Sequence, residues 1–440
     1  MFRIRLFFYL IIIIYSLNSV YSQSQFKFDD EEKRAVTLKF RSVNNLIILS
    51  ATLNGELVNF LVDTGVNKTK IFGEIRDSTA LEDAEYLFLR SLGSVEPVKA
   101  YKTTNNVIDF GPISGENQEV YFIVDPRFDL AKKLGVNVQG IIGYEFFKNF
   151  IVRLNYHRKS LRVYQNEKFN RKLRRFDEVD FRFIRKKPHL KFPVELKEGK
   201  KEELVFLIDT GSSDAFWIFE NDEISAPENS FEDYIGYGLE LAVIGKRSKS
   251  KSAQLGSYTL DEPRVAYLDS ESAEQFTADR FKNGIVGSEI LRRFVWFFDY
   301  GKQKMYLKPS RYYNDNFNYD RSGLILMYVG EEINTVKTPV LVKINEDNNY
   351  GTSQSERFEI RLERSQILQV VQIRKNSPAS EVDIRKGDRI LKLNGKSVDR
   401  LDLQDINDLL SGEEGKQIKI QLKRDKAILK RSLYLKSQLN

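Results

Sequence analysis

The sequence predicts a mostly β fold, with two pseudo-symmetric β-barrel lobes in one chain and a smaller α+β domain after them. The chain has 440 residues, 41% hydrophobic and 30% charged, as expected for a globular protein with more than one domain. One motif and its flanking strands occur twice, at an offset of about 144 residues. After Leu307 the pattern changes, and turn, strand and helix signals of a different kind follow.

Asp-Thr-Gly occurs twice, and each copy ends an apolar run with the character of a buried strand. The first copy is Asp63-Thr64-Gly65 after residues 60–62, and the second is Asp209-Thr210-Gly211 after residues 204–208. A buried carboxylate is costly, and in practice its pKa shifts. Two such carboxylates facing each other would share one proton and activate a water between them.

The repeat extends well beyond the motif. Gly140-Ile141-Ile142-Gly143 follows the first copy, and Gly284-Ile285-Val286-Gly287 follows the second, 144 residues further on. Asn-Gly between apolar runs is a strong hairpin signal, and β-branched and aromatic residues favour strands. The pattern therefore predicts the following elements: turns at 54–55 and 198–199, short helices over 144–149 and 288–293, closing strands over 151–154 and 295–298, and a polar linker over 165–178.

Asp-Thr-Gly followed roughly 75 to 80 residues later by two apolar residues and a glycine resembles the aspartic proteases of the retropepsin and pepsin type. Two such units in one chain resemble the bilobal form, in which each lobe contributes one aspartate to a single cleft. The resemblance implies two acid-protease β-barrel lobes, over residues 35–165 and 179–310. It also implies an active site that is complete in a monomer and needs no cofactor or metal.

The resemblance assigns a role to each motif residue. Asp63 and Asp209 would form the catalytic dyad, which hydrolyses peptide bonds of a peptide or protein substrate in the inter-lobe cleft. The residues expected to support the dyad are Thr64 and Thr210, which bridge the lobes, Gly65 and Gly211, which bring backbone amides close to the carboxylates, and Ser212, which can donate to the outer oxygen of Asp209. Val66 replaces that donor in the first lobe.

Flaps over the cleft are expected in glycine-containing hairpins between the motifs. Gly93, within Leu92-Gly93-Ser94, and Gly238, within Tyr237-Gly238-Leu239, are the candidate flap glycines for contact with substrate.

The last 120 or so residues resemble a PDZ domain. Ser377-Pro378-Ala379 begins a short helix, a Gly-Asp turn at 387–388 leads into an apolar strand, and Asn394-Gly395 forms a turn. An amphipathic helix over 402–410 and a strand over 418–422 complete the pattern, so we expect a PDZ domain over residues 320–437. It would bind a peptide C-terminus as an added strand, with Gly323, Leu324 and Ile325 as the candidate groove residues.

The N-terminal residues predict a secretory signal peptide over residues 1–22. Arg3 and Arg5 precede an apolar core over 6–15, and small residues lead to a cleavage site after Ser22. A single membrane anchor is the alternative, although the apolar core is shorter than the roughly 20 residues that a spanning helix needs. We therefore expect a secreted or periplasmic protein with no membrane span after signal removal.

Composition narrows the functional classes further. The chain has no cysteine and two histidines, which excludes disulfides and thiol chemistry and leaves too few residues for a zinc site. Lys and Arg number 69 against 62 Asp and Glu, and the basic clusters lack interleaved aromatic residues, so we expect no nucleic-acid partner. The alternative to an endopeptidase is a non-catalytic, secreted peptide-binding scaffold that retains the protease fold.

Overall fold

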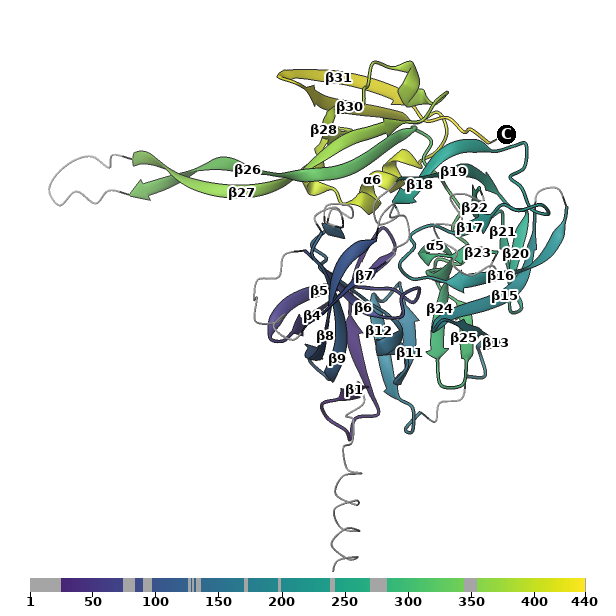
Figure 1. Cartoon of the computed structure of the whole chain (residues 1–440). Helices are drawn as coiled ribbons and strands as arrows, with labels where there is room; N and C mark the ends of the chain where they lie inside the picture. Colours follow the sequence, from purple (N-terminus) through teal and green to yellow (C-terminus); the bar gives the residue numbers. More distant parts are fainter. Residues whose placement is uncertain are drawn as a thin grey trace, which may run out of the picture.

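The computed structural model describes residues 25–73, 84–89, 97–125, 128, 130–131, 136–169, 173–196, 199–237, 242–269, 283–343 and 354–439. Two β lobes stand side by side, and a third β domain lies above them with a long two-stranded arm (Figure 1). The expected signal peptide and the flap glycines Gly93 and Gly238 lie outside the described residues. Within the described part of the chain, no helix is long and apolar enough to cross a membrane.

The first lobe is built on a nine-stranded sheet with the order β1-β9-β6-β10-β5-β4-β8-β7, and β3 pairs with β4. Its strands are β1 (Gln25–Phe28), β3 (Arg41–Val43), β4 (Leu46–Leu53), β5 (Glu56–Val62), β6 (Thr69–Phe72), β7 (Glu85–Leu89), β8 (Val98–Asp109), β9 (Ile113–Ile123) and β10 (Gly140–Ile142). The lobe thus begins before the expected residue 35, because β1 pairs antiparallel with β9 and buries Phe26 and Phe28 in the core.

The second lobe repeats this plan in a ten-stranded sheet with the order β18-β19-β22-β17-β23-β16-β15-β20-β21, and β14 pairs with β15. Its strands are β14 (Arg182–Ile184), β15 (Lys187–Glu195), β16 (Lys201–Ile208), β17 (Phe216–Phe219), β18 (Phe231–Tyr237), β19 (Ala242–Lys249), β20 (Ser252–Leu255), β21 (Tyr258–Asp261), β22 (Arg264–Leu268) and β23 (Gly284–Val286).

A six-stranded sheet joins the two lobes, with the order β13-β25-β24-β11-β12-β2. Its strands are β2 (Ala35–Lys39), β11 (Phe150–Asn155), β12 (Ser160–Gln165), β13 (Asp177–Asp180), β24 (Phe294–Asp299) and β25 (Lys304–Pro309). The two closing strands of the repeat, β11 and β24, pair with each other at its centre. Phe147 packs edge-on against Phe298 with ring centroids 5.7 Å apart, so one aromatic core runs through both lobes.

Short helices follow the two apolar-apolar-Gly segments where the repeat predicts them. Helix α3 (Tyr144–Phe147) begins after Gly143, and helix α5 (Ser288–Leu291) begins after Gly287. Both are a single turn long, shorter than the expected six residues, because the chain turns at once into the closing strands β11 and β24.

The C-terminal domain has its own hydrophobic core, in which Leu368, Val370 and Ile390 are fully buried. Its sheet has the order β26-β27-β28-β30-β31, with β29 paired to β28. The elements are β26 (Leu324–Lys343), β27 (Gln354–Ile373), η3 (Pro378–Glu381), β28 (Arg389–Leu393), β29 (Lys396–Ser397), η4 (Val398–Arg400), α6 (Leu403–Leu410), β30 (Gln417–Arg424) and β31 (Ala427–Tyr434). Asp402 caps α6 by accepting a hydrogen bond from the Asp405 amide, as Asp at an N-cap commonly does.

Candidate active site

The two Asp-Thr-Gly motifs meet where the lobes join. Asp63 directly follows β5, and β10 runs parallel to that strand, so the Asp63 amide donates to the Ile142 carbonyl at 2.8 Å. In the second lobe, β23 runs parallel to β16, and the Asp209 amide donates to the Val286 carbonyl at 2.9 Å. The apolar-apolar-Gly segments therefore hold each aspartate in place from behind.

The threonines of the motifs bind each other's loops across the junction. The Thr64 hydroxyl donates to the Ile208 carbonyl at 2.6 Å and accepts from the Thr210 amide at 3.1 Å. Reciprocally, the Thr210 hydroxyl donates to the Val62 carbonyl at 2.7 Å and accepts from the Thr64 amide at 3.1 Å. Both threonines are fully buried, so four hydrogen bonds shielded from water fix the two loops relative to each other.

The motif glycines leave room that any side chain would fill. The Gly65 amide donates to Asp63 Oδ1 at 2.6 Å, and the Gly211 amide donates to Asp209 Oδ1 at 2.8 Å. A Cβ on Gly211 would lie 2.4 Å from Asp63 Cγ, and a Cβ on Gly65 would lie 3.0 Å from Asp209 Cγ. Each glycine therefore packs against the carboxylate of the opposite lobe, and the two carboxylates can approach each other.

The glycines that end the apolar-apolar-Gly segments also stand where a side chain would collide with its neighbours. A Cβ on Gly143 would lie 2.1 Å from the Asp63 carbonyl oxygen, and one on Gly287 would lie 2.4 Å from the Asp214 carbonyl oxygen. Real Cβ atoms do not approach backbone oxygens this closely. Both contacts press the segment against the loop that carries the aspartate.

The surroundings of Asp63 favour its protonated form. Burial raises the pKa of Asp63 well above its ordinary value, and the charge and hydrogen bond of Asp209 raise it further. The Gly65 amide and the positive charge of Lys187 oppose this rise to a smaller extent. Asp63 and Asp209 are each partly exposed as residues.

Two lysines near the dyad were not found from the sequence. Lys187 lies at the start of β15 and acts electrostatically on Asp63. Lys70, in β6, has its pKa lowered by burial and by the charge of Lys187, while Asp63 acts in the opposite direction. Neither lysine belongs to a recognisable motif, because β6 and β15 belong to different lobes and lie far apart in the sequence.

The residues after the two motifs, Ser212 and Val66, make matching backbone contacts. The Ser212 amide donates to the Asp209 carbonyl at 3.4 Å, and its carbonyl accepts from the Ser288 amide at 2.7 Å. Among the hydrogen bonds of the described residues, none joins the Ser212 hydroxyl to Asp209. Val66 makes the same backbone contacts, with the Asp63 carbonyl at 3.2 Å and the Tyr144 amide at 3.0 Å.

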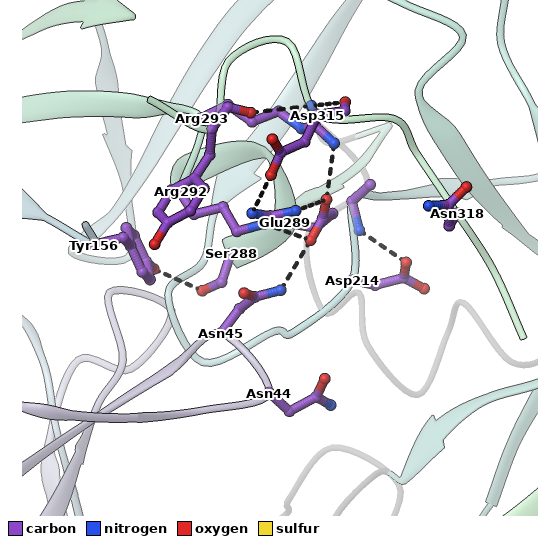
Figure 2. A network of polar contacts seen from close by, with 12 residues as sticks. Asn44, Asn45, Tyr156, Asp214, Ser288, Glu289, Arg292, Arg293, Asp315 and Asn318 are labelled. Atoms are coloured by element: carbon purple, nitrogen blue, oxygen red, sulfur yellow. Dashed lines mark hydrogen bonds and ion pairs between the residues drawn. The ribbon is translucent and has the colours of Figure 1, made fainter. Parts of the chain in front are cut away.

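The lobes differ at the tyrosines that follow their closing strands. Tyr156 donates to the Ser288 hydroxyl at 2.9 Å (Figure 2). Ser288 in turn donates to the Thr210 carbonyl at 3.1 Å. In the other lobe Tyr144 occupies the position that corresponds to Ser288, and the buried Tyr300 hydroxyl has no hydrogen-bond partner among the described residues. Only the loop of Asp209 is therefore supported by a tyrosine–serine relay.

A buried carboxylate ties the first lobe to α5 of the second. Glu289 accepts from Asn45 at 2.9 Å, from Arg292 Nε at 2.8 Å and from Arg293 Nη2 at 2.9 Å (Figure 2). Burial acts to raise the pKa of Glu289, but the hydrogen bond from Arg292 and the charges of both arginines lower it below its ordinary value. Glu289 is therefore an ionised structural anchor.

The same turn of the first lobe contacts the C-terminal domain. Asn44 and Asn45 both have positive φ angles, 48° and 64°, as the hairpin between β3 and β4 requires. Asn407 of α6 donates to Asn44 Oδ1 at 3.1 Å, and Leu403 of α6 packs against the hydrophobic cluster of the first lobe. The helix expected to flank the peptide groove thus rests on the protease lobes.

The candidate flap glycines fall between strands that pair antiparallel. Gly93 lies between β7 and β8, whose last paired residues before the loop are Leu89 and Val98. Gly238 lies between β18 and β19, whose last paired residues before the loop are Tyr237 and Ala242. The flanking strands are therefore hairpins, while the glycines themselves lie outside the described residues. On β7, Tyr86 and Phe88 are largely exposed, at 55% and 61%.

A chain of alternating charges leads away from the loop of Asp209. Asp214 accepts from Arg264 Nε at 2.9 Å and from Arg247 Nη1 at 3.1 Å, and Arg247 Nε donates to Asp233 Oδ2 at 2.6 Å. Although burial would raise the pKa of Asp214, the charges of Arg247 and Arg264 lower it to about 2. Asp214, Asp233 and Arg247 are each only 6% exposed, so the ion pairs are shielded from solvent.

The charge chain continues into the C-terminal domain. Arg374, at the end of β27, donates to Asp233 Oδ1 from Nη2 at 2.7 Å and from Nε at 2.9 Å. Its Nη2 also lies 3.2 Å from Asp320 Oδ2. Asp233 and Arg374 border a cavity of about 500 Å³ between the β18–β19 hairpin and the C-terminal domain. An unbroken path of ion pairs therefore connects the loop of Asp209 with the loop at residues 320–324.

The candidate groove residues of the C-terminal domain follow this loop. Gly323 has a φ of 79°, and a Cβ there would lie 2.0 Å from the Ser377 hydroxyl. Leu324 and Ile325 are buried and begin β26, the edge strand next to α6. The Tyr328 hydroxyl donates to the Leu401 carbonyl at 3.5 Å, and the Arg321 amide donates to the Leu410 carbonyl at 2.9 Å, so β26 runs along α6.

The amides of this loop already bind a carboxylate of the chain itself. Asp320 accepts from the Ser322 amide at 3.0 Å and from the Gly323 amide at 2.8 Å, and the Ser322 hydroxyl accepts from the Leu324 amide at 3.0 Å. The amides of residues 322–324 therefore all have partners within the chain.

Paired Asp-Thr-Gly loops, held together between two β lobes and a joining sheet, define an aspartic-protease-like fold, and the third domain has the β–α arrangement of a PDZ domain. A family model described as aspartyl protease matches residues 49–146, and one described as PDZ domain matches residues 369–424. These matches support an aspartyl protease domain in the first lobe and a PDZ domain at the C-terminus.

Comparison with solved structures also finds the crystal structure of aspartic proteinase from Irpex lacteus, with 13% sequence identity and a TM-score of 0.40, covering 64% of this chain and 100% of that chain. Comparison with curated proteins gave no match. Among the described residues, no cluster of three or more His, Cys, Asp or Glu side chains could hold a metal ion.

Replacement of Arg247 by Met should destabilise the protein by about 3–5 kcal/mol, because Asp214 and Asp233 would remain buried without their common partner. Chemical denaturation measures this loss. The exposed neighbour Lys246, replaced by Met, is the matched control and should change the free energy of unfolding by less than about 0.5 kcal/mol. Equal losses in the two variants would contradict a structural role for the charge chain.

Proposed function

We propose that the chain is an aspartic endopeptidase in which Asp63 and Asp209 activate a water to hydrolyse peptide bonds. This proposal rests on the close approach of the two carboxylates. The reciprocal threonine hydrogen bonds hold the two loops together, and each motif glycine lacks the Cβ that would collide with the opposite carboxylate. Two carboxyl groups this close retain one proton between them at a pH where isolated carboxyl groups would be ionised.

In the proposed mechanism, Asp63 carries the shared proton because burial and the charge of Asp209 raise its pKa. Asp209 accepts a proton from the attacking water, while the Asp63 hydroxyl donates a hydrogen bond to the substrate carbonyl oxygen. A C–O bond forms, and Asp63 transfers its proton to the former carbonyl oxygen, which gives a tetrahedral diol. Asp209 then transfers the proton taken from water to the amide nitrogen, and the C–N bond breaks while a diol hydroxyl returns a proton to Asp63. An amine and a carboxylic acid are released, and the pair again holds one proton.

We further propose that the protein acts after secretion or in the periplasm, on the strength of the predicted signal peptide over residues 1–22. The PDZ domain would bind the C-terminus of a substrate or partner, with Gly323, Leu324 and Ile325 along its groove. In this proposal the carboxylate of Asp320 occupies the loop when no ligand is bound, since it already has the amide contacts and the Arg374 partner that a peptide carboxylate would need.

Replacement of Asp209 by Asn should lower kcat for peptide cleavage by roughly 10³-fold or more, because the general base is lost. Replacement of Asp63 by Asn should have a similar effect. Cleavage of a peptide library, followed by mass spectrometry, measures this loss, and circular dichroism checks that the fold is intact. Replacement of the exposed Asp222 by Asn is the matched control and should leave activity unchanged. A wild-type chain that binds library peptides but cleaves none between acidic and neutral pH would support the scaffold alternative instead.

The dependence of kcat/KM on pH should show an alkaline limb, because activity needs the proton on Asp63. Activity should fall at high pH, as Asp63 loses this proton through a pKa raised above the ordinary 3.8. Since Lys187 lowers the pKa of Asp63, replacement of Lys187 by Met should move the alkaline limb to higher pH. Replacement of Lys191 by Met, an exposed lysine on the same strand, is the control. An alkaline limb that does not respond to Lys187 would refute this assignment of the proton to Asp63.

Replacement of Asp320 by Ala should strengthen binding of a peptide with a free C-terminal carboxylate by roughly threefold to tenfold, because the loop amides lose their internal competitor. Fluorescence anisotropy on the full chain, with Asp209 replaced by Asn to prevent cleavage, measures the affinity. The same peptide with an amidated C-terminus should bind weakly to both forms. Replacement of the exposed Asp399 by Ala is the control. If free and amidated peptides bind equally well, the loop is not a carboxylate site.

A further inference from the structure

Strands β26 and β27 extend beyond the core of the PDZ domain as a two-stranded arm. Strands β26 and β27 stay paired from Leu324↔Ile373 out to Lys343↔Gln354, far beyond Leu368, which is buried in the domain core (Figure 1). Between Gln366 and Gln354 the arm extends by roughly 40 Å at about 3.3 Å per residue. Among the described strands, β28 pairs with the other edge of β27 only at Gln369, so that edge is open along the whole arm.

The arm also exposes apolar side chains along one face. Phe358, Ile360 and Leu362 alternate on β27, so they point to the same side, and they are 57%, 62% and 70% exposed. A two-stranded hairpin is marginally stable in water, and an open edge with apolar residues is a ready site for pairing with another strand. These features call for a partner that adds a strand to β27.

The sequence of β27 indicates that this partner strand is a second copy of β27. Two copies that run antiparallel would place complementary residues opposite each other. Residues 354–366 read Gln-Ser-Glu-Arg-Phe-Glu-Ile-Arg-Leu-Glu-Arg-Ser-Gln. Positions equally far from the central isoleucine, Ile360, hold matching residues: Glu359 with Arg361, Phe358 with Leu362, Arg357 with Glu363, Glu356 with Arg364, Ser355 with Ser365, and Gln354 with Gln366. Every charge therefore has an opposite charge at its mirror position.

We propose that two copies of this chain associate through β27, antiparallel and edge to edge, on a two-fold axis at Ile360. In that register Ile360 lies opposite the second copy's Ile360, Phe358 opposite its Leu362, and Glu359 opposite its Arg361. Directly opposed residues of antiparallel strands are neighbours on one face, where opposite charges and apolar pairs stabilise the sheet. The two arms form one four-stranded sheet, with the apolar residues of both copies on the same face.

Neighbouring registers are disfavoured by the same sequence. A shift that centres the pair on Glu359 places Glu359 opposite its own copy and Arg357 opposite the second copy's Arg361. A shift that centres it on Arg361 places Arg361 opposite its own copy and Glu359 opposite the second copy's Glu363. Like charges directly opposed are destabilising. Registers centred between two residues place apolar residues opposite charged ones. The apolar residues of the two copies then lie on opposite faces of the sheet.

The proposed register places the two PDZ cores at opposite ends of the shared sheet. Gln366 lies opposite the second copy's Gln354, where its strand begins. Leu368, at the edge of the PDZ core, follows Gln366, so the paired strands lie between the two cores. The inference is independent of the proposed peptidase activity.

Because the chain has no cysteine, single substitutions give a clean cross-linking test. With Ile360→Cys, the two sulfur-bearing residues oppose each other at a Cα separation of about 4.5–5.5 Å, within the range of a disulfide. Mild oxidation of the full chain should convert it to a covalent dimer. With Leu362→Cys, the two cysteines lie about 13 Å apart along the strands and should not cross-link.

Charge substitution tests the register in solution. In Glu359→Arg, arginine opposes arginine twice across the axis, so the dimer measured by sedimentation equilibrium should weaken by roughly tenfold or more. The exchange of both residues, Glu359→Arg with Arg361→Glu, restores opposite charges and should recover the affinity. Glu413→Arg, on an exposed loop of the same domain, makes the same charge change and is the control.

A chain that remains monomeric at about 100 µM would overturn the proposal. So would a dimer that is insensitive to Glu359→Arg, or one that cross-links equally through positions 360 and 362, because either result places the contact elsewhere. Binding of an extended peptide to this edge in a monomeric chain would assign the edge to a different partner and would also overturn it.

Discussion

The structure depends on the reciprocal hydrogen bonds between Thr64 and Thr210. Each hydroxyl donates to a carbonyl of the opposite lobe and accepts an amide from the opposite threonine, in a site that water does not reach. A buried hydroxyl without partners would cost several kcal/mol, so the lobes are held in the one arrangement that satisfies all four bonds. Because Asp63 and Asp209 are the preceding residues, this arrangement also sets their separation.

The two lobes share one plan but support their aspartates unequally. The loop of Asp209 has the Tyr156–Ser288 relay and the buried charge chain through Asp214. The corresponding region of the first lobe has Tyr144 in place of that serine, with Tyr300 packed against aromatic rings. Lys187 also acts on Asp63. These unequal surroundings are consistent with the proposed function, in which Asp63 acts as the acid and Asp209 as the base.

The PDZ domain is joined to the protease lobes by polar contacts as well as by chain connectivity. Asn407 binds the turn at Asn44, and Arg374 links Asp320 to Asp233. Buried ion pairs of this kind hold their partners in place, because separating them would leave a buried charge without a partner, at a large cost in free energy. The position of the loop at residues 320–324 is therefore tied to the position of the β18–β19 hairpin. The sequence predicts a flap over the cleft between β18 and β19, so in the proposed function a ligand in the groove and a substrate in the cleft would act on connected parts.

The sequence by itself determined the mostly β fold, the duplicated lobes and the PDZ domain, because these are written in local patterns: the spacing of Asp-Thr-Gly and apolar-apolar-Gly, turn residues and the period of the strands. The mirror-related residues of β27 can be read in the sequence, but only the structure shows that they lie on a strand with an open edge. Only the tertiary structure decided the hydroxyl partners of Thr64 and Thr210, the position of Lys187 and the occupation of the PDZ loop by Asp320. The physical reason is that each of these contacts joins residues far apart in the chain, and hydrogen bonds and charges act over a few ångströms that only the packing of the lobes brings about.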